Sequence, residues 1–125
     1  MKPLKLAIAG IGTVGAGVVH ALAERRAEIG ERAGCKFEIV GVSGRDKNKK
    51  RGCNLEDIPW TDDAPTLANS DCDVVVELIG GEDGPAYALV KAALGAGKHV
   101  VTANKAMLAH HGAELAALAE KNNVA

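Results

Sequence analysis

Aromatic side chains are nearly missing from this chain. Its 125 residues include one tryptophan, one tyrosine and one phenylalanine, together 2% of the composition. Single-stranded nucleic-acid sites depend on stacking of bases against aromatic rings, so this composition argues against such a partner. A core of this chain must be built from Val, Leu, Ile and Ala, which suits a parallel sheet covered by helices.

Excess charge, paired cysteines and long apolar runs are missing as well. The formal net charge is −1, so no basic field attracts nucleic acid. The three cysteines include no Cys-x-x-Cys pair, which indicates neither a metal site nor a disulfide framework, and a reducing, cytoplasmic location fits best. No apolar run reaches the ~18 residues of a membrane span, and no signal peptide fits before the first strand. We therefore expect no metal, membrane or nucleic-acid partner.

Strand-like and helix-like segments alternate along the chain, whose length suits one domain. Apolar runs predict strands at residues 4–9, 37–42, 73–79 and 99–101, and residues 124–125 resemble the start of another. We expect helices after a glycine turn at residues 10–15, at 85–94 and at 113–120, with short helical turns near 66–69 and 104–109. Gly30 and Gly34 are candidate stops of the first helix. This alternation predicts an α/β fold, a Rossmann-like, doubly wound parallel sheet in a single domain.

The glycine turn between the first strand and the first helix is the strongest motif. It reads Gly10-Ile11-Gly12-Thr13-Val14-Gly15. Gly10 allows a sharp turn off the strand, Gly12 leaves room for a pyrophosphate, and Gly15 allows close packing of the helix. The N–H groups of the first helical turn then face the anion. The motif predicts dinucleotide binding, and a plain structural turn is the alternative.

The residues at the end of the second predicted strand should determine the selectivity for NAD or NADP. Dinucleotide sites selective for NAD usually place an acid there to bind the ribose hydroxyls. Here the strand ends in Ser43-Gly44-Arg45, and Arg45 suits a 2′-phosphate through its planar guanidinium group. The pattern favours NADP, with NAD possible because Asp46 is within reach of a ribose. A merely solvated basic loop is the alternative.

Two further loops follow strands at the same edge of the predicted sheet. Ile79, Gly80 and Gly81 end the third strand, where a lack of side chains would let cofactor or substrate approach, or simply allow a tight turn. Glu77 interrupts that apolar strand and must find a partner or face a cavity. Lys105, in the loop 102–105, suits stabilisation of a developing oxyanion, although a lysine that points to water is equally plausible. His110 and His111 lack ligand spacing and suit a surface or packing role.

The chain resembles the N-terminal nucleotide-binding domain of homoserine dehydrogenase. Three segments carry the resemblance, which spans essentially the whole chain: the glycine turn with Gly17-Val18, Val75-Val76-Glu77-Leu78-Ile79-Gly80-Gly81, and Gly97-Lys98-His99-Val100-Val101-Thr102-Ala103-Asn104-Lys105-Ala106 with Leu108-Ala109. The last segment is the most specific. The family reduces aspartate semialdehyde to homoserine with NADPH or NADH, on the route to threonine, isoleucine and methionine.

The resemblance implies roles for particular residues. It assigns cofactor-phosphate contacts to Gly12, Thr13 and Val14, the adenosine end to Arg45, and the nicotinamide ribose to Gly80. It makes Lys105 the catalytic lysine beside the nicotinamide and the substrate. The full set of expected cofactor contacts is Gly10, Gly12, Thr13, Val14, Gly15, Ser43, Arg45, Ile79, Gly80, Gly81, Thr102, Asn104 and Lys105.

Family members continue into a substrate-binding and dimerisation domain. That domain supplies a second catalytic lysine, acidic substrate ligands and a monovalent-cation site. We therefore expect residues 1–125 to be the NAD(P)-binding domain alone, inactive by itself, and the full enzyme to be a homo-oligomer.

Two other functions stay open from the sequence. One is an enzyme of the glucose–fructose oxidoreductase-like family, whose members usually carry Glu-Lys-Pro where this chain has Asn104-Lys105-Ala106. The other is a nucleotide-sensing module without catalysis.

Overall fold

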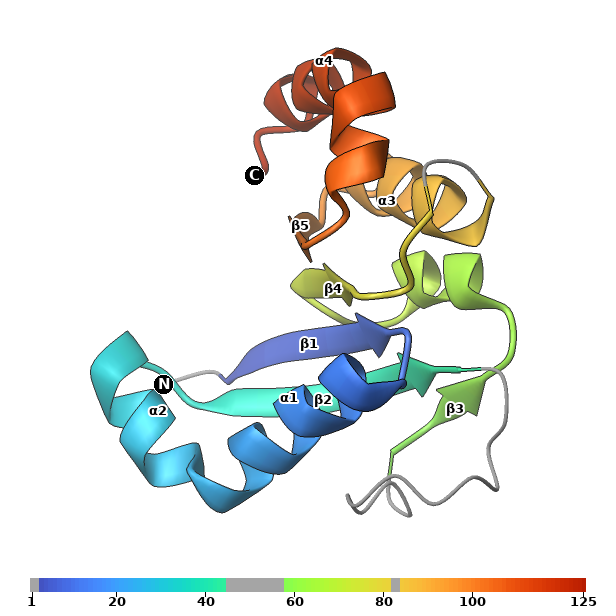
Figure 1. The fold of residues 1–125 in the computed structure, drawn as a ribbon. Coiled ribbons are helices and arrows are strands. Elements are labelled where there is room, and N and C mark those ends of the chain that lie inside the picture. Colours follow the sequence, from blue (N-terminus) through green and yellow to red (C-terminus); the bar gives the residue numbers. More distant parts are fainter. Residues whose placement is uncertain (1–2, 45–57, 82–83) are drawn as a thin grey trace.

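The computed structural model describes residues 3–44, 58–81 and 84–125. Within them, five parallel strands form one sheet in the order β3-β2-β1-β4-β5 (Figure 1). The strands are β1 (Leu4–Ala9), β2 (Phe37–Ser43), β3 (Trp60–Thr61), β4 (Val74–Glu77) and β5 (His99–Thr102). The helices are α1 (Thr13–Glu24), α2 (Arg26–Ala33), the 3-10 helix η1 (Ala64–Asn69), α3 (Pro85–Gly95) and α4 (Lys105–Lys121). The doubly wound α/β fold predicted from the alternation is confirmed.

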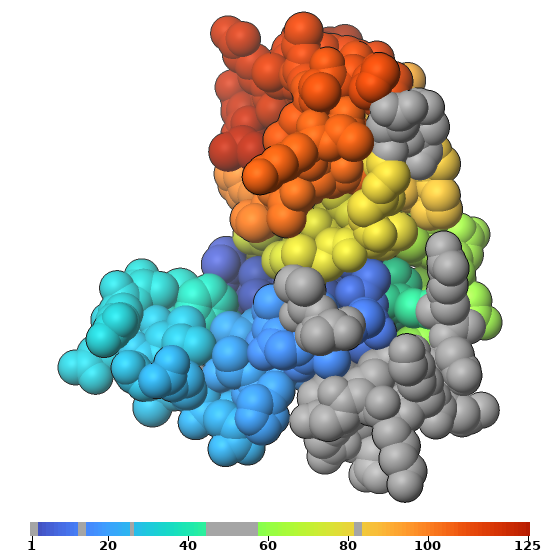
Figure 2. Space-filling model, in the orientation of Figure 1, coloured from blue at the N-terminus to red at the C-terminus, as the bar shows by residue number. Residues whose placement is uncertain are grey.

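The two faces of the sheet pack against different helices, as the alternation of side chains along β1 requires. Ala7 and Ala9 lie in a buried cluster with residues of η1 and α3, including Leu67 and Leu89. Ile8 points to the opposite cluster, which contains residues of α1. A third cluster lies between α3 and α4, so α4 packs against α3. Figure 2 shows the result, with α1 and α2 extending to one side and α4 at the opposite end.

The structure corrects several expected boundaries. Neither Gly30 nor Gly34 stops the first helix, because α1 ends at Glu24 and a separate helix α2 follows. Gly34 ends α2 in a left-handed conformation with φ 74°, as is typical of a terminating glycine, whereas Gly30 lies inside α2. The expected separation of a short helical turn near 104–109 from a helix at 113–120 is wrong, because α4 continues through Gly112. A Cβ on Gly112 would meet no atom within 4 Å, while Met107 and Leu115 on either side of it are buried. Burial of these side chains against α3 accounts for the continuous helix.

The edges of the sheet also differ from expectation. β3 was not predicted, because two residues are too few to show an alternating pattern. At the opposite edge, the carbonyl oxygen of Ala125 accepts a hydrogen bond of 2.8 Å from the N–H of Val100 in β5. The backbone of residues 124–125 therefore runs beside β5, where the sequence predicts the start of a further strand.

Candidate cofactor-binding site

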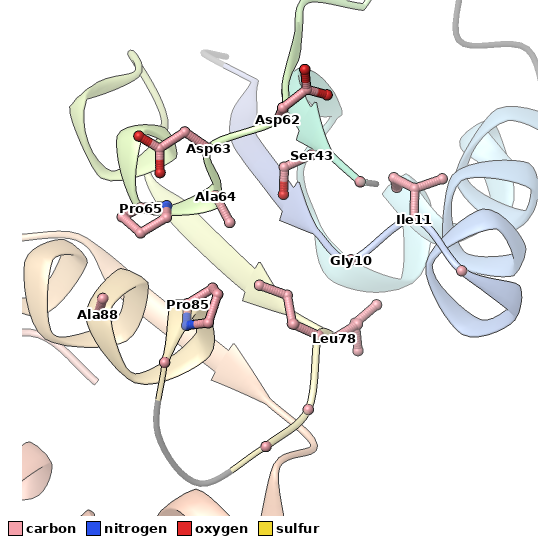
Figure 3. Close-up of a pocket in the computed structure, with 16 residues that line it drawn as sticks. Gly10, Ile11, Ser43, Asp62, Asp63, Ala64, Pro65, Leu78, Pro85 and Ala88 are labelled. Carbon is pink, nitrogen blue, oxygen red and sulfur yellow. The ribbon is translucent and has the colours of Figure 1, made fainter. Parts of the chain in front are cut away.

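A cleft of about 1000 Å³ opens at the carboxyl ends of β1, β2 and β4 (Figure 3). This is the edge at which doubly wound sheets bind ligands. In the close-up, Gly10 and Ile11 lie on one side of the cleft, and η1 and the start of α3 lie on the other. Its lining residues are Gly10, Ile11, Gly12, Ser43, Gly44, Asp62, Asp63, Ala64, Pro65, Leu78, Ile79, Gly80, Gly81, Gly84, Pro85 and Ala88.

The glycine turn fits closely against its neighbours. Gly10 has φ 95°, a left-handed conformation that side chains rarely adopt. A Cβ on Gly10 would lie 2.7 Å from the carbonyl carbon of Leu78 and 2.8 Å from the nitrogen of Ile79. A Cβ on Gly15 would lie 2.2 Å from the carbonyl oxygen of Gly10. These two positions require glycine for reasons of packing, whether or not a ligand is bound.

Gly12 differs from these two glycines, because its missing side chain opens onto space. A Cβ there would meet no atom within 4 Å, and the residue lines the cleft. Gly12 is also the N-cap of α1, and no side chain caps the first-turn N–H groups, which include those of Thr13 and Val14. No acidic side chain lies in that turn. Uncapped N–H groups and the positive end of the helix dipole suit an anion, so the turn fits the pyrophosphate of a dinucleotide.

The end of β2 is tied to the same turn. The carbonyl oxygen of Ser43 accepts hydrogen bonds of 3.0 Å from the N–H groups of both Gly10 and Ile11. Ser43 is buried and lines the cleft, as expected of a cofactor contact. Arg45, on which the NADP expectation depends, lies outside the described residues.

Two acidic residues that the sequence reading did not single out line the cleft together with Ser43. β3 pairs in register with the end of β2, so Asp62 follows it at the same edge of the sheet as Ser43. Asp62 Oδ1 accepts a hydrogen bond of 2.8 Å from Trp60 Nε1, and Asp63 precedes η1. Carboxylates accept from ribose hydroxyls and repel phosphates. The signal in the sequence was an acidic pair just before Pro65, which becomes informative only once β3 is known.

Glu77 has the partners that its position in an apolar strand requires. Its side chain is fully buried at the end of β4. The parallel pairing of β4 with β5 places Thr102 opposite Glu77. Oε2 accepts from the N–H of Ile79 at 2.7 Å and from that of Gly80 at 3.1 Å. Oε1 accepts from the hydroxyl of Thr102 at 2.6 Å. Both carboxylate oxygens of Glu77 therefore have partners, and the three donors offset the cost of burying the carboxylate.

The same hydrogen bonds continue to the start of α4. The hydroxyl of Thr102 accepts from the N–H of Asn104 at 3.0 Å. The side-chain oxygen of Asn104 caps α4 by accepting from the N–H of Met107 at 3.0 Å, and its amide nitrogen donates to the carbonyl oxygen of Gly81. Asn104 is 7% exposed, so it acts here as a structural link. The loops at residues 79–81 and 102–105 are thus joined.

The cleft collects six of the thirteen expected contacts. Gly10, Gly12, Ser43, Ile79, Gly80 and Gly81 line it, and Gly15 supports the turn from behind. Thr102, Asn104 and Lys105 do not line it. Thr102 and Asn104 join the network behind the 79–81 loop, and Lys105 is exposed as the first residue of α4. The ring of His111 stacks on Tyr87 at 4.1 Å between α3 and α4, which fits the expected packing role.

Comparisons with known proteins agree with this geometry. Residues 10–125 match the family model described as the NAD binding domain of homoserine dehydrogenase. The chain belongs to this family. It is 46% identical to the homoserine dehydrogenase of Pseudomonas aeruginosa over 125 residues, which cover 99% of this chain and 28% of that protein. The relative from Corynebacterium glutamicum is 42% identical over 95% of this chain and 26% of its own length.

Solved homoserine dehydrogenases have the same fold. The crystal structure from S. aureus matches with a TM-score of 0.87 and 40% identity, over 100% of this chain and 32% of that one. The enzyme from Thiobacillus denitrificans matches with a TM-score of 0.85 and 38% identity, over 99% of this chain and 28% of that one. The chain therefore spans about a third or less of the length of these relatives. Among its described residues, no helix is both long and apolar enough to cross a membrane.

Proposed function

We propose that this homoserine dehydrogenase domain binds NADP(H) for the reduction of aspartate semialdehyde to homoserine. The open space at Gly12 carries the proposal, because it leaves the uncapped first turn of α1 accessible to a pyrophosphate. The family membership supports it independently. A cytoplasmic location, expected from the cysteine usage, belongs to the same proposal.

The cleft divides into two ends in this proposal. Ser43, Asp62 and Asp63 lie on the side of β2 and β3, which suits the adenosine. The 79–81 loop lies on the side of β4 and suits the nicotinamide ribose. Glu77 already receives the N–H groups of Ile79 and Gly80, so their backbone can contact a ligand only through carbonyl oxygens. Carbonyl oxygens accept hydrogen bonds from hydroxyl groups, which ribose supplies.

Lys105 is the proposed catalytic residue. A bound reduced nicotinamide would supply the hydride that passes to the aldehyde carbon. The ammonium group of Lys105 would stabilise the negative charge that develops on the aldehyde oxygen. The second lysine and the acidic substrate ligands that the resemblance implies belong to the substrate-binding domain of the longer enzyme, which is also where we place its homo-oligomeric contacts.

Titration of the chain with NADPH and NADH tests the binding, and addition of aspartate semialdehyde tests the division of labour. We expect NADPH to bind, and its absorbance to stay constant when the aldehyde is added. Turnover by these residues alone would contradict the assignment of essential groups to another domain. Failure of both dinucleotides to bind would contradict the proposal as a whole.

A further inference from the structure

Glu77 is the one fully buried charged side chain among the described residues. The proposed chemistry does not use it, because Glu77 is not itself among the residues that line the cleft. Each of its carboxylate oxygens is nevertheless committed, one to the 79–81 loop and the other to Thr102. Burial of a carboxylate costs free energy unless hydrogen-bond donors satisfy its oxygens. The three donors around Glu77 therefore indicate a specific role for this side chain.

The bonds of Glu77 determine which groups the 79–81 loop can offer. Gly80 and Gly81 have φ 90° and 86°, so the loop turns through a left-handed conformation directly after the strand. The two N–H bonds to Glu77 fix the orientation of the first two peptides of this turn. Without them, these N–H groups would be free to turn toward the cleft and compete with the carbonyl oxygens for a ligand.

The loop also supports the glycine turn. A Cβ on Gly10 would lie 2.8 Å from the nitrogen of Ile79, the same nitrogen whose hydrogen is donated to Glu77. Movement of Ile79 therefore changes the wall against which Gly10 packs. Glu77 pairs with Ala9 of β1 on one side and with Thr102 of β5 on the other, so it lies between these two strands.

Two hydrogen-bonded links connect Glu77 and the 79–81 loop to the start of α4. Thr102 donates to Glu77 and accepts from the N–H of Asn104, and Asn104 in turn caps α4 and donates to Gly81. The ring of contacts Glu77–Thr102–Asn104–Gly81 closes through the backbone of the 79–81 loop. Lys105 follows Asn104 directly, so its backbone position depends on this ring.

We propose that Glu77 is a positioning residue that couples the nicotinamide end of the cleft to the start of the helix carrying Lys105. The inference rests on the proposed function for what these two regions bind, whereas the coupling itself is a property of the free chain. The hydrogen-bonded ring couples the 79–81 and 102–105 loops, so that a displacement of one loop displaces the other.

Amide hydrogen exchange of the ligand-free chain tests the coupling. Thr102→Val removes the hydroxyl but leaves the two bonds from the 79–81 loop to Glu77. We expect exchange of the Ile79 and Gly80 amides to accelerate about fivefold together with that of Asn104, as loss of one hydrogen bond allows. Acceleration confined to Asn104 and Met107 would overturn the coupling. Glu77→Gln should accelerate exchange of the same three amides, and Glu38→Gln, an exposed change in β2, serves as the matched control.

Ligand binding then separates a positioning role from loss of stability. NADPH and its adenosine half, 2′,5′-ADP, are titrated into the wild type and Thr102→Val; NADH and ADP replace them if NADH binds more tightly. We expect the Kd of the dinucleotide to rise about fivefold and that of the adenosine half to stay within twofold. Equal effects on both ligands would overturn the positioning role. If the wild type binds neither dinucleotide, the proposed function fails, and the exchange experiment decides the coupling alone.

Discussion

Gly15 packs directly against Gly10: a Cβ atom on Gly15 would lie 2.2 Å from the carbonyl oxygen of Gly10. Gly15 is therefore needed because the first turn of α1 packs too closely against the glycine turn to leave room for a side chain. The sequence predicts that Gly15 allows close packing of the helix, and in the structure the close contact is with the glycine turn itself.

Gly15→Ala should destabilise the fold. Relief of the contact with Gly10 requires a shift of backbone, which we expect to cost about 1–3 kcal/mol. Urea unfolding measures the change. Gly17→Ala is the matched control in the same helix, because its Cβ meets no atom within 4 Å. It should raise stability by about 0.5–1 kcal/mol, as alanine is favoured over glycine in a helix. A Gly15→Ala variant as stable as the wild type would show that the turn yields easily.

Lys105 should contribute nothing to stability. It is the exposed first residue of α4, where a positive charge opposes the helix dipole. Lys105→Gln should therefore unfold at the same or slightly higher urea concentration, with a gain of about 0.3–1 kcal/mol. In the full-length enzyme the same change should lower kcat strongly, because the developing oxyanion loses its cation. A marked loss of stability would assign this lysine a structural role instead.

The Lys5–Asp71 ion pair should make the free energy of unfolding depend on pH in the acidic range. Lys5 Nζ lies 2.6 Å from Asp71 Oδ2, which joins β1 to the segment before β4. The hydrogen bond from Lys5 and its charge lower the pKa of Asp71 below its ordinary value of 3.8. The stabilisation is therefore present above pH 3.8 and is lost as the pH falls through the lowered pKa of the folded state.

Urea unfolding of Asp71→Asn between neutral pH and about pH 2 checks this dependence. The variant should be less stable than the wild type at neutral pH, and the difference should disappear at the acidic end. Asp62→Asn serves as a control, since within residues 3–44, 58–81 and 84–125 its carboxylate accepts from Trp60 and pairs with no cation. A constant difference between wild type and Asp71→Asn across the range would contradict the account.

Arg45 should determine the preference for NADP. If its guanidinium group pairs with a 2′-phosphate, Arg45→Ala should raise the Kd of NADPH roughly tenfold or more and leave that of NADH unchanged. Asp62 and Asp63 line the cofactor cleft and favour ribose hydroxyls, so neutralising Asp63 should shift the preference toward NADPH. Isothermal titration calorimetry measures each affinity. An unchanged NADPH affinity in Arg45→Ala would remove the basis for NADP selectivity.

The sequence predicted the parts of the fold that local patterns determine. The alternating and continuous apolar runs located β1, β2, β4 and β5, and the glycines of the first turn located one wall of the cleft. The opposite wall was missed, because Asp62, Asp63 and Pro65 reach the cleft only through β3, whose two residues carry no pattern. Gly112 was misread because burial of Met107 and Leu115 in the same helix overrides the low helix propensity of a single glycine.

Glu77 shows the same limit within the site. The sequence established that a carboxylate in an apolar strand needs partners. Its partners come from the following loop and from Thr102 on the neighbouring strand, and only the pairing of β4 with β5 brings that hydroxyl opposite. The local sequence thus shows that Glu77 needs hydrogen-bond donors, and the register of β4 with β5 supplies one of them.

Titration of Gly12→Ala with NADPH tests the central claim most directly. Gly12 has φ −97°, which alanine adopts readily, and its Cβ would meet no protein atom within 4 Å. The variant should therefore fold as stably as the wild type, while the added methyl group occupies the space proposed for the pyrophosphate. We predict a loss of NADPH affinity of at least about tenfold, with Gly17→Ala binding like the wild type. Wild-type affinity in Gly12→Ala would contradict the assignment of the cleft as the dinucleotide site.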